Sequence, residues 1–178
     1  MYFDLTTSAD RLETIRAYQK HLLRALRVAK GVHSRLDKNN RALVLKTIAA
    51  INNIRYQVYE KAKVFGYVNR CTDAIVVCKG ECCSWHFPRN LGYLELFVIV
   101  CSTSSVQQSA LEDQICSHNW LYQCPVRRED GCLLSFNSRP LTCAMAYPCF
   151  AGDAYHQFLE EKKKEVDVYY RILKKLFQ

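Results

Sequence analysis

The chain has 178 residues, of which 49% are hydrophobic and 10 are cysteine, and its formal net charge is +8 at pH 7. A chain of this length and composition can bury a core without covalent staples, which argues against a small disulfide scaffold. We predict a single domain in which residues 1–70 form a basic helical hairpin, residues 71–150 a cysteine-cluster region and residues 151–178 a C-terminal helix.

The N-terminal residues give no sign of a secretory signal. Residues 1–5 lack the basic segment and the long apolar run of a signal peptide. The longest apolar runs, such as residues 96–101, are too short to span a bilayer, so no membrane span is expected. We therefore expect a cytoplasmic protein, in which thiols stay reduced and clustered cysteines more often bind metal than form disulfides.

Apolar residues recur at helical spacing along the N-terminal third of the chain. In the first segment the steps are three, four or seven, as shown by Leu12, Ile15, Leu22, Leu26, Ala29 and Leu36. This pattern predicts a helix that ends near residue 35. A second helix is expected from about residue 41 to residue 65, with Gly66 as its stop. The connector, residues 37–40, is short, so the two helices are expected to pack as an antiparallel hairpin.

Three further helices are predicted downstream. One is capped at Asn90 and runs to Cys101, and another short helix is expected over residues 106–122. Residues 124–150 contain many turn signals and are expected to be mainly coil. The last helix starts at Asp153 and has an apolar stripe formed by Tyr155, Leu159, Val166, Tyr169, Leu173 and Leu176. The predicted fold class is mostly α, with the N-terminal helical hairpin and the C-terminal helix packed around a coil-rich cysteine site.

Seven of the ten cysteines fall into two clusters between residues 78 and 149. The seven are Cys78, Cys82, Cys83, Cys124, Cys132, Cys143 and Cys149. Thiolates are the ligands of iron–sulfur clusters and of structural zinc, because both favour soft anionic sulfur. The spacing of Cys78 and Cys82, with Gly80 between them, allows two thiolates to reach one site across a tight turn. The sequence therefore predicts a metal site assembled from two distant loops.

The second cluster has its own turn signal. Glu129-Asp130-Gly131 is typical of a turn, which is expected to swing Cys132 back towards Cys124. Arg139 is a candidate cofactor-binding residue, since its guanidinium could donate to a backbone carbonyl, a carboxylate or a thiolate sulfur. A hydrogen bond to sulfur would tune the charge of the metal centre.

These motifs resemble the cysteine-cluster family with a CxxCxxCC-type signature, the YkgJ-like zinc- or iron-chelating domains. The resemblance covers about residues 71–150 and rests on Cys78-x3-Cys82-Cys83, Cys124-Pro125, Asp130-Gly131-Cys132, Arg139-Pro140-x2-Cys143 and Tyr147-Pro148. The family usually has a further cysteine three residues before the position of Cys78, where this chain has Ile75. Whether Cys71 replaces that ligand stays open. Flagellin lysine N-methylases are similar in the same region but are considerably longer.

The leading interpretation is a protein that holds an iron–sulfur cluster through these thiolates, for redox chemistry, for sensing or to support a modification reaction. Zn²⁺ is the competing metal, and iron–sulfur is preferred because the thiols outnumber the four ligands of one zinc ion. One alternative is a structural zinc module whose basic helices bind a partner. Another is a metal-dependent enzyme related to the flagellin lysine N-methylases, although no catalytic motif supports catalysis.

The basic residues are concentrated in the N-terminal helices. Residues 1–70 contain 14 Lys and Arg against 5 Asp and Glu, a net charge of +9, whereas residues 71–150 contain 5 against 7, a net charge of −2. Such a surface could bind an unknown protein partner or nucleic acid, or could simply be a solvated helix face. Outside the two clusters, Cys101 and Cys116 are expected to be ordinary buried cysteines.

Overall fold

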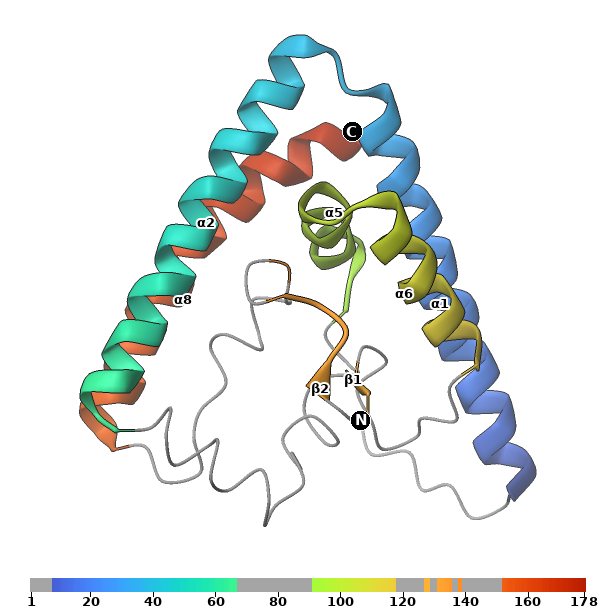
Figure 1. Cartoon of the computed structure of the whole chain (residues 1–178), viewed down its shortest axis with the longest axis horizontal. Coiled ribbons are helices and arrows are strands. Elements are labelled where there is room, and N and C mark those ends of the chain that lie inside the picture. The colour runs from blue at the N-terminus through green and yellow to red at the C-terminus, as the bar shows by residue number, and fades with distance from the viewer. Residues whose placement is uncertain (1–7, 67–90, 118–126, 129–130, 136–137, 139–151) are drawn as a thin grey trace.

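The structure is a computed structural model that describes residues 8–66, 91–117, 127–128, 131–135, 138 and 152–178 (Figure 1). Its elements are α1 (Ser8–Arg35), α2 (Lys38–Val64), α5 (Tyr93–Ser102), α6 (Ser105–Ser117), β1 (Arg127–Arg128), β2 (Gly131–Cys132), α8 (Asp153–Lys174) and the 3₁₀ helix η3 (Lys175–Phe177). The fold is therefore mostly α, as predicted from the sequence.

The apolar stripe predicted for α1 forms most of its buried face. Leu22, Leu26 and Ala29 have no exposed surface, and Ile15 is 8% exposed. These residues lie three, four or seven positions apart and so share one side of the helix. Leu12 was predicted to belong to this stripe, but it is 52% exposed because it borders an open hollow at the beginning of α1.

Helix α2 begins earlier than the sequence predicted because Asp37 caps it. The Asp37 carboxylate accepts a hydrogen bond from the backbone N–H of Asn40 at 2.8 Å, which satisfies one of the free donors of the first turn. At the other end, the backbone N–H of Phe65 donates to the carbonyl oxygen of Lys61. Gly66 follows with φ +69°, a left-handed conformation that ends the helix as predicted.

Two glycine substitutions are expected to have opposite effects on stability. Gly66→Ala is expected to lower the free energy of unfolding by about 1 kcal/mol, because a side chain is disfavoured at positive φ. Gly31→Ala is expected to raise it by about 0.5–1 kcal/mol, because Gly31 lies inside α1 and the nearest atom to an added Cβ is 4.0 Å away. Urea denaturation followed by circular dichroism measures both. A Gly66→Ala protein as stable as Gly31→Ala would contradict this account.

The helices α1 and α2 are connected as a hairpin, but the prediction that they pack together is wrong. They diverge from the connector at Leu36 and Asp37 like two sides of a triangle (Figure 1). Helix α1 packs against α5 and α6, whereas α2 packs mainly against α8. The apolar face of each long helix is thus covered by a different partner. We call α1 with α6 the first arm of the fold and α2 with α8 the second arm.

Helix α5 lies between the two arms and supplies the centre of the core (Figure 1). Five consecutive residues, 96–100, are buried, so the helix is apolar on all sides and contacts α1, α2 and α8. The Phe97 and Phe177 rings meet edge to face with centroids 5.1 Å apart, which ties α5 to the end of the chain. Among the described helices, none combines the length and the apolar character needed to cross a bilayer.

Helix α8 closes the second arm with the stripe that the sequence predicted. Four residues of the stripe are buried: Tyr155, Leu159, Val166 and Leu173. Tyr169 and Leu176 are partly buried and pack against the same core. The prediction of a long amphipathic C-terminal helix is confirmed.

Candidate functional site

Most of the predicted metal ligands lie outside the described residues. These are Cys78, Cys82, Cys83, Cys124, Cys143 and Cys149, together with Arg139 and the doubtful Cys71. Cys132 is described in its backbone, on β2. Within the described part of the chain, no group of three or more His, Cys, Asp or Glu is arranged to hold a metal. The described elements that border the cysteine segments therefore carry the information about the site.

The strands β1 and β2 are the described part of the second cluster. They pair antiparallel, with Arg127 opposite Cys132 and Arg128 opposite Gly131. The chain therefore reverses between Arg128 and Gly131, and this confirms the turn predicted there. Opposite Cα atoms in such a pair lie about 5 Å apart. Cys132 thus lies opposite Arg127, which follows Cys124 by only three positions in the sequence.

The segment after β2 is fixed to the helical core. Leu134, two residues after Cys132, is 1% exposed. Ser138 is also buried, and its hydroxyl donates to the carbonyl oxygen of Ser102, the last residue of α5, at 2.9 Å. The backbone N–H of Ser138 donates to the carbonyl oxygen of Ser135 at 2.9 Å. These contacts hold Ser138 against the end of α5 and Leu134 in the core.

A second boundary of the cysteine region lies where α2 ends and α8 begins. The Phe65 and Tyr155 rings meet there with centroids 5.8 Å apart. The Lys61 ammonium lies 5.5 Å from the Phe65 ring centroid and 5.7 Å from that of Phe158, so it bridges the two helices by cation–π contacts. The end of α2 and the start of α8 thus lie at the same corner of the fold (Figure 1).

Two side-chain contacts fix helix α6 to α1. The Lys30 ammonium of α1 pairs with the Glu112 carboxylate of α6 at 2.6 Å. The Gln19 side-chain amide donates to the carbonyl oxygen of Cys116 at 3.3 Å. Gln19 interrupts the apolar stripe of α1, and this contact explains why a polar residue is found there. The last turn of α6 is thus placed beside the first half of α1.

The two described cysteines outside the clusters differ in their surroundings. Cys101, in α5, is partly buried. Burial raises the pKa of its thiol to about 12, against an opposing effect of the nearby Arg41 guanidinium, so the thiolate nucleophile is scarce at neutral pH. Cys116 is exposed at the last turn of α6. The prediction that Cys116 is buried is wrong, because this side of α6 faces solvent.

A buried polar group joins α2, α5 and α8, and the sequence interpretation missed it. Arg55 has no exposed surface, and its Nη1 atom donates to the Asn52 side-chain oxygen at 2.7 Å. Burial raises the pKa of Tyr170, with a further increase from the nearby Glu95 carboxylate and an opposing effect of the Arg55 guanidinium. Arg55 lies four residues after Ile51 and three before Val58, so it falls on the apolar stripe of α2. This position is the sequence feature that could have identified it as buried.

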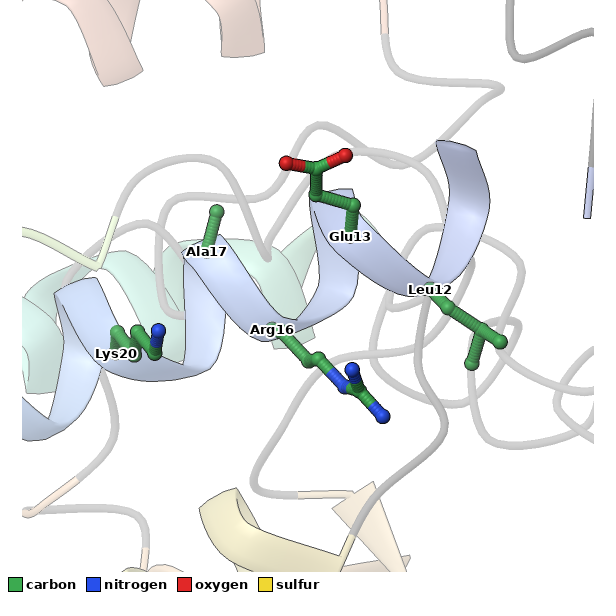
Figure 2. A pocket seen from close by; sticks show the side chains of 5 residues that line it. All are labelled: Leu12, Glu13, Arg16, Ala17 and Lys20. Atoms are coloured by element: carbon green, nitrogen blue, oxygen red, sulfur yellow. The ribbon is translucent and has the colours of Figure 1, made fainter. Parts of the chain in front are cut away.

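The outer face of α1 carries cations beside a hollow of about 540 Å³. The described residues that line the hollow are Leu12, Glu13, Arg16, Ala17 and Lys20. In Figure 2 the Arg16 side chain extends to the same side of the helix as Leu12, while Glu13 and Ala17 extend to the other side. Arg16 and Lys20 are both exposed.

Comparison with models of known protein families, with curated proteins and with solved structures gives no match.

Proposed function

We propose that the protein binds an iron–sulfur cluster through thiolates drawn from the seven clustered cysteines, with Zn²⁺ as the competing metal. The observation that carries the proposal is the β1–β2 pair, which sets Cys132 opposite Arg127, a residue that follows Cys124 by three positions in the sequence. The burial of Leu134 and the hydrogen bond of Ser138 tie this pair to the core. A thiol on an anchored strand loses less conformational entropy when it becomes a ligand.

Chain lengths permit the remaining cysteines to reach a common site. A trans peptide chain spans at most about 3.4 Å per residue. Cys149 precedes Gly152 by three residues, so it lies within about 10 Å of the start of α8. Cys78 follows Gly66, at the end of α2, by twelve residues and has a reach of about 40 Å. Because α2 ends beside the start of α8, both clusters are tethered to the same corner of the framework.

The donor set favours an iron–sulfur cluster over zinc. All seven candidates are sulfur, and seven thiolates exceed the four that a single tetrahedral zinc ion requires. Arg139 directly follows the anchored Ser138, and a guanidinium there would offset the negative charge of a thiolate-bound centre. An iron–sulfur cluster would supply one-electron chemistry at the site. Membership of the YkgJ-like family is part of the same proposal.

The proposal is tested by a matched pair of cysteine variants. Cys132→Ser is expected to lose most of the bound metal, because it removes a thiol from the anchored part of the cluster. Cys116→Ser is expected to keep it, because Cys116 is an exposed residue of α6 outside the clusters. Iron, acid-labile sulfide and zinc are measured per chain after purification without oxygen. Full metal content in Cys132→Ser, or equal loss in both variants, would contradict the proposal.

Thiol alkylation followed by peptide mapping gives a second readout, which does not depend on measuring the metal itself. Cys116 is expected to react quickly with or without a chelator, and Cys101 slowly in both cases because of its high pKa. At least four of the seven clustered cysteines are expected to react quickly only after the metal has been removed. If all seven reacted as fast as Cys116 before chelation, metal ligation would be excluded.

A further inference from the structure

Four cations form a continuous stripe on the exposed side of α1. Arg16, Lys20, Arg24 and Arg27 are all exposed and are spaced by four, four and three residues. At 100° per residue they fall within an arc of about 80°, and at 1.5 Å per residue they extend over about 16 Å. We call these four residues the basic stripe.

The charges of the basic stripe are not neutralised within the described part of the protein. No carboxylate there lies within 4.0 Å of any of the four cations, whereas Lys30, three residues after Arg27, pairs with Glu112. Helix α1 contains no Asp or Glu between Thr14 and Arg35. Four like charges at adjacent helical positions repel one another, and this cost is removed when a polyanion binds.

We propose that the basic stripe binds the phosphate backbone of double-stranded nucleic acid without sequence preference. Double-stranded DNA carries one phosphate charge per about 1.7 Å of its axis when both strands are counted, so about 16 Å of duplex offers about nine phosphates to the four cations. The stripe belongs to a helix whose opposite face is buried against α5, so the backbone that carries the four cations is fixed. A fixed row of positive charge suits the regular backbone of a duplex. Three of the four cations are arginines, which bind phosphate with a planar fork of donors.

Other partners fit the basic stripe less well. A protein partner usually buries aromatic or apolar anchors at the centre of its interface, and the stripe contains none. Single-stranded nucleic acid is usually held by stacking on aromatic side chains, which are also missing from the four positions. A membrane-bound amphipathic helix inserts its apolar face, but Leu22 and Leu26 of α1 are buried in the core.

The test compares two quadruple variants that have the same net charge. The stripe variant is Arg16→Gln, Lys20→Gln, Arg24→Gln and Arg27→Gln. The control variant is Lys164→Gln, Arg171→Gln, Lys174→Gln and Lys175→Gln, which changes four exposed cations at the other end of the chain. Glutamine keeps helix propensity close to that of Lys and Arg, and circular dichroism confirms that both variants fold. Both have the formal charge lowered by four, from +8 to +4.

Binding of a fluorescently labelled 20-base-pair duplex is measured by anisotropy between 50 and 200 mM salt. For four phosphate contacts, the affinity of the unaltered protein is expected to fall by roughly 100-fold over this range. The stripe variant is expected to lose this salt dependence, with the slope of log affinity against log salt reduced by about four. The control variant is expected to keep it.

Several results would overturn the proposal. These are no binding at 50 mM salt, equal losses in the stripe and control variants, or binding of a single strand of the same length that is as tight as binding of the duplex. Tighter binding to a polyglutamate peptide would instead assign the stripe to an acidic protein. Tighter binding to vesicles that contain phosphatidylserine would assign it to a membrane surface. The metal content is measured in every sample, so failure of the metal proposal is recognised separately.

Discussion

Replacing Phe97 by alanine is expected to lower the free energy of unfolding by about 3–5 kcal/mol, the range found for buried Phe→Ala substitutions. Phe97 has no exposed surface and lies in α5, the helix that contacts α1, α2 and α8. Its loss removes an aromatic contact with Phe177 and leaves a cavity where both arms of the protein meet. The two arms do not pack on each other, so they depend on α5 for their shared core.

The matched control for this substitution is Val106→Ala in the neighbouring helix α6. Val106 is 76% exposed, so the change is expected to stay within about 0.5 kcal/mol. Urea denaturation followed by circular dichroism measures both proteins at equal metal content. An effect of Phe97→Ala below about 1 kcal/mol would mean that α5 is not the shared core of the two arms.

Replacing Arg55 by alanine is expected to lower the free energy of unfolding by about 2–5 kcal/mol, because truncating a large, fully buried side chain leaves a cavity and an unpaired polar partner. The side chain of Arg55 is fully buried and donates to Asn52. Its guanidinium also acts on Tyr170 of α8, close to the Glu95 carboxylate of α5. Without Arg55, Asn52 would lose the hydrogen bond that its side-chain oxygen accepts, and the space of the guanidinium would be left empty.

Two further substitutions separate charge from packing at this position. Lys46→Ala, at an exposed position of the same helix, is the control and is expected to change stability by no more than about 0.5 kcal/mol. Arg55→Met keeps apolar volume but removes the charge, and is expected to fall between the other two. Urea denaturation measures all three. If Arg55→Ala were no more destabilising than Lys46→Ala, the buried polar group would have no role in stability.

The helices could be predicted from the sequence because each has its own local signal. The stripe of Leu22, Leu26 and Ala29 gave α1, and the positive φ of Gly66 agrees with the stop expected after α2. The start of α2 was placed about three residues too late, because residues 37–40 were all assigned to a polar connector with capping residues, and Asp37 is the one of them that caps the helix. Periodicity identifies a buried face, whereas a cap decides where the helix begins.

The arrangement of the helices could not be predicted in the same way. A periodic stripe shows that a face is buried but not which partner covers it, so a short connector suggested that α1 packs on α2. The all-apolar run of α5, residues 96–100, was the signal that a third helix lies between them. Arg55 was missed for a related reason, because a polar residue on an apolar stripe can be read either as an imperfection or as a buried polar contact.

Of the predictions for the candidate site, only the chain reversal after Arg128 is observed. Glu129-Asp130-Gly131 predicted a chain reversal, and the pairing of Arg127 with Cys132 has that reversal. Turn residues signal locally, so a single segment was enough to predict it. The contact of Ser138 with Ser102 depends on residues 36 positions apart and has no local signal. Assembly of the two cysteine clusters into one site is also a long-range event and stays a prediction.

The central claim is that the clustered cysteines hold a metal, and the most direct test is metal and sulfide analysis of protein purified without oxygen. The account predicts iron and acid-labile sulfide in equal amounts, with broad absorption near about 400 nm that is typical of iron–sulfur proteins. One zinc ion per chain with no colour would replace the cluster by the zinc alternative. Protein that contains neither metal, with its clustered thiols paired as disulfides, would contradict the account.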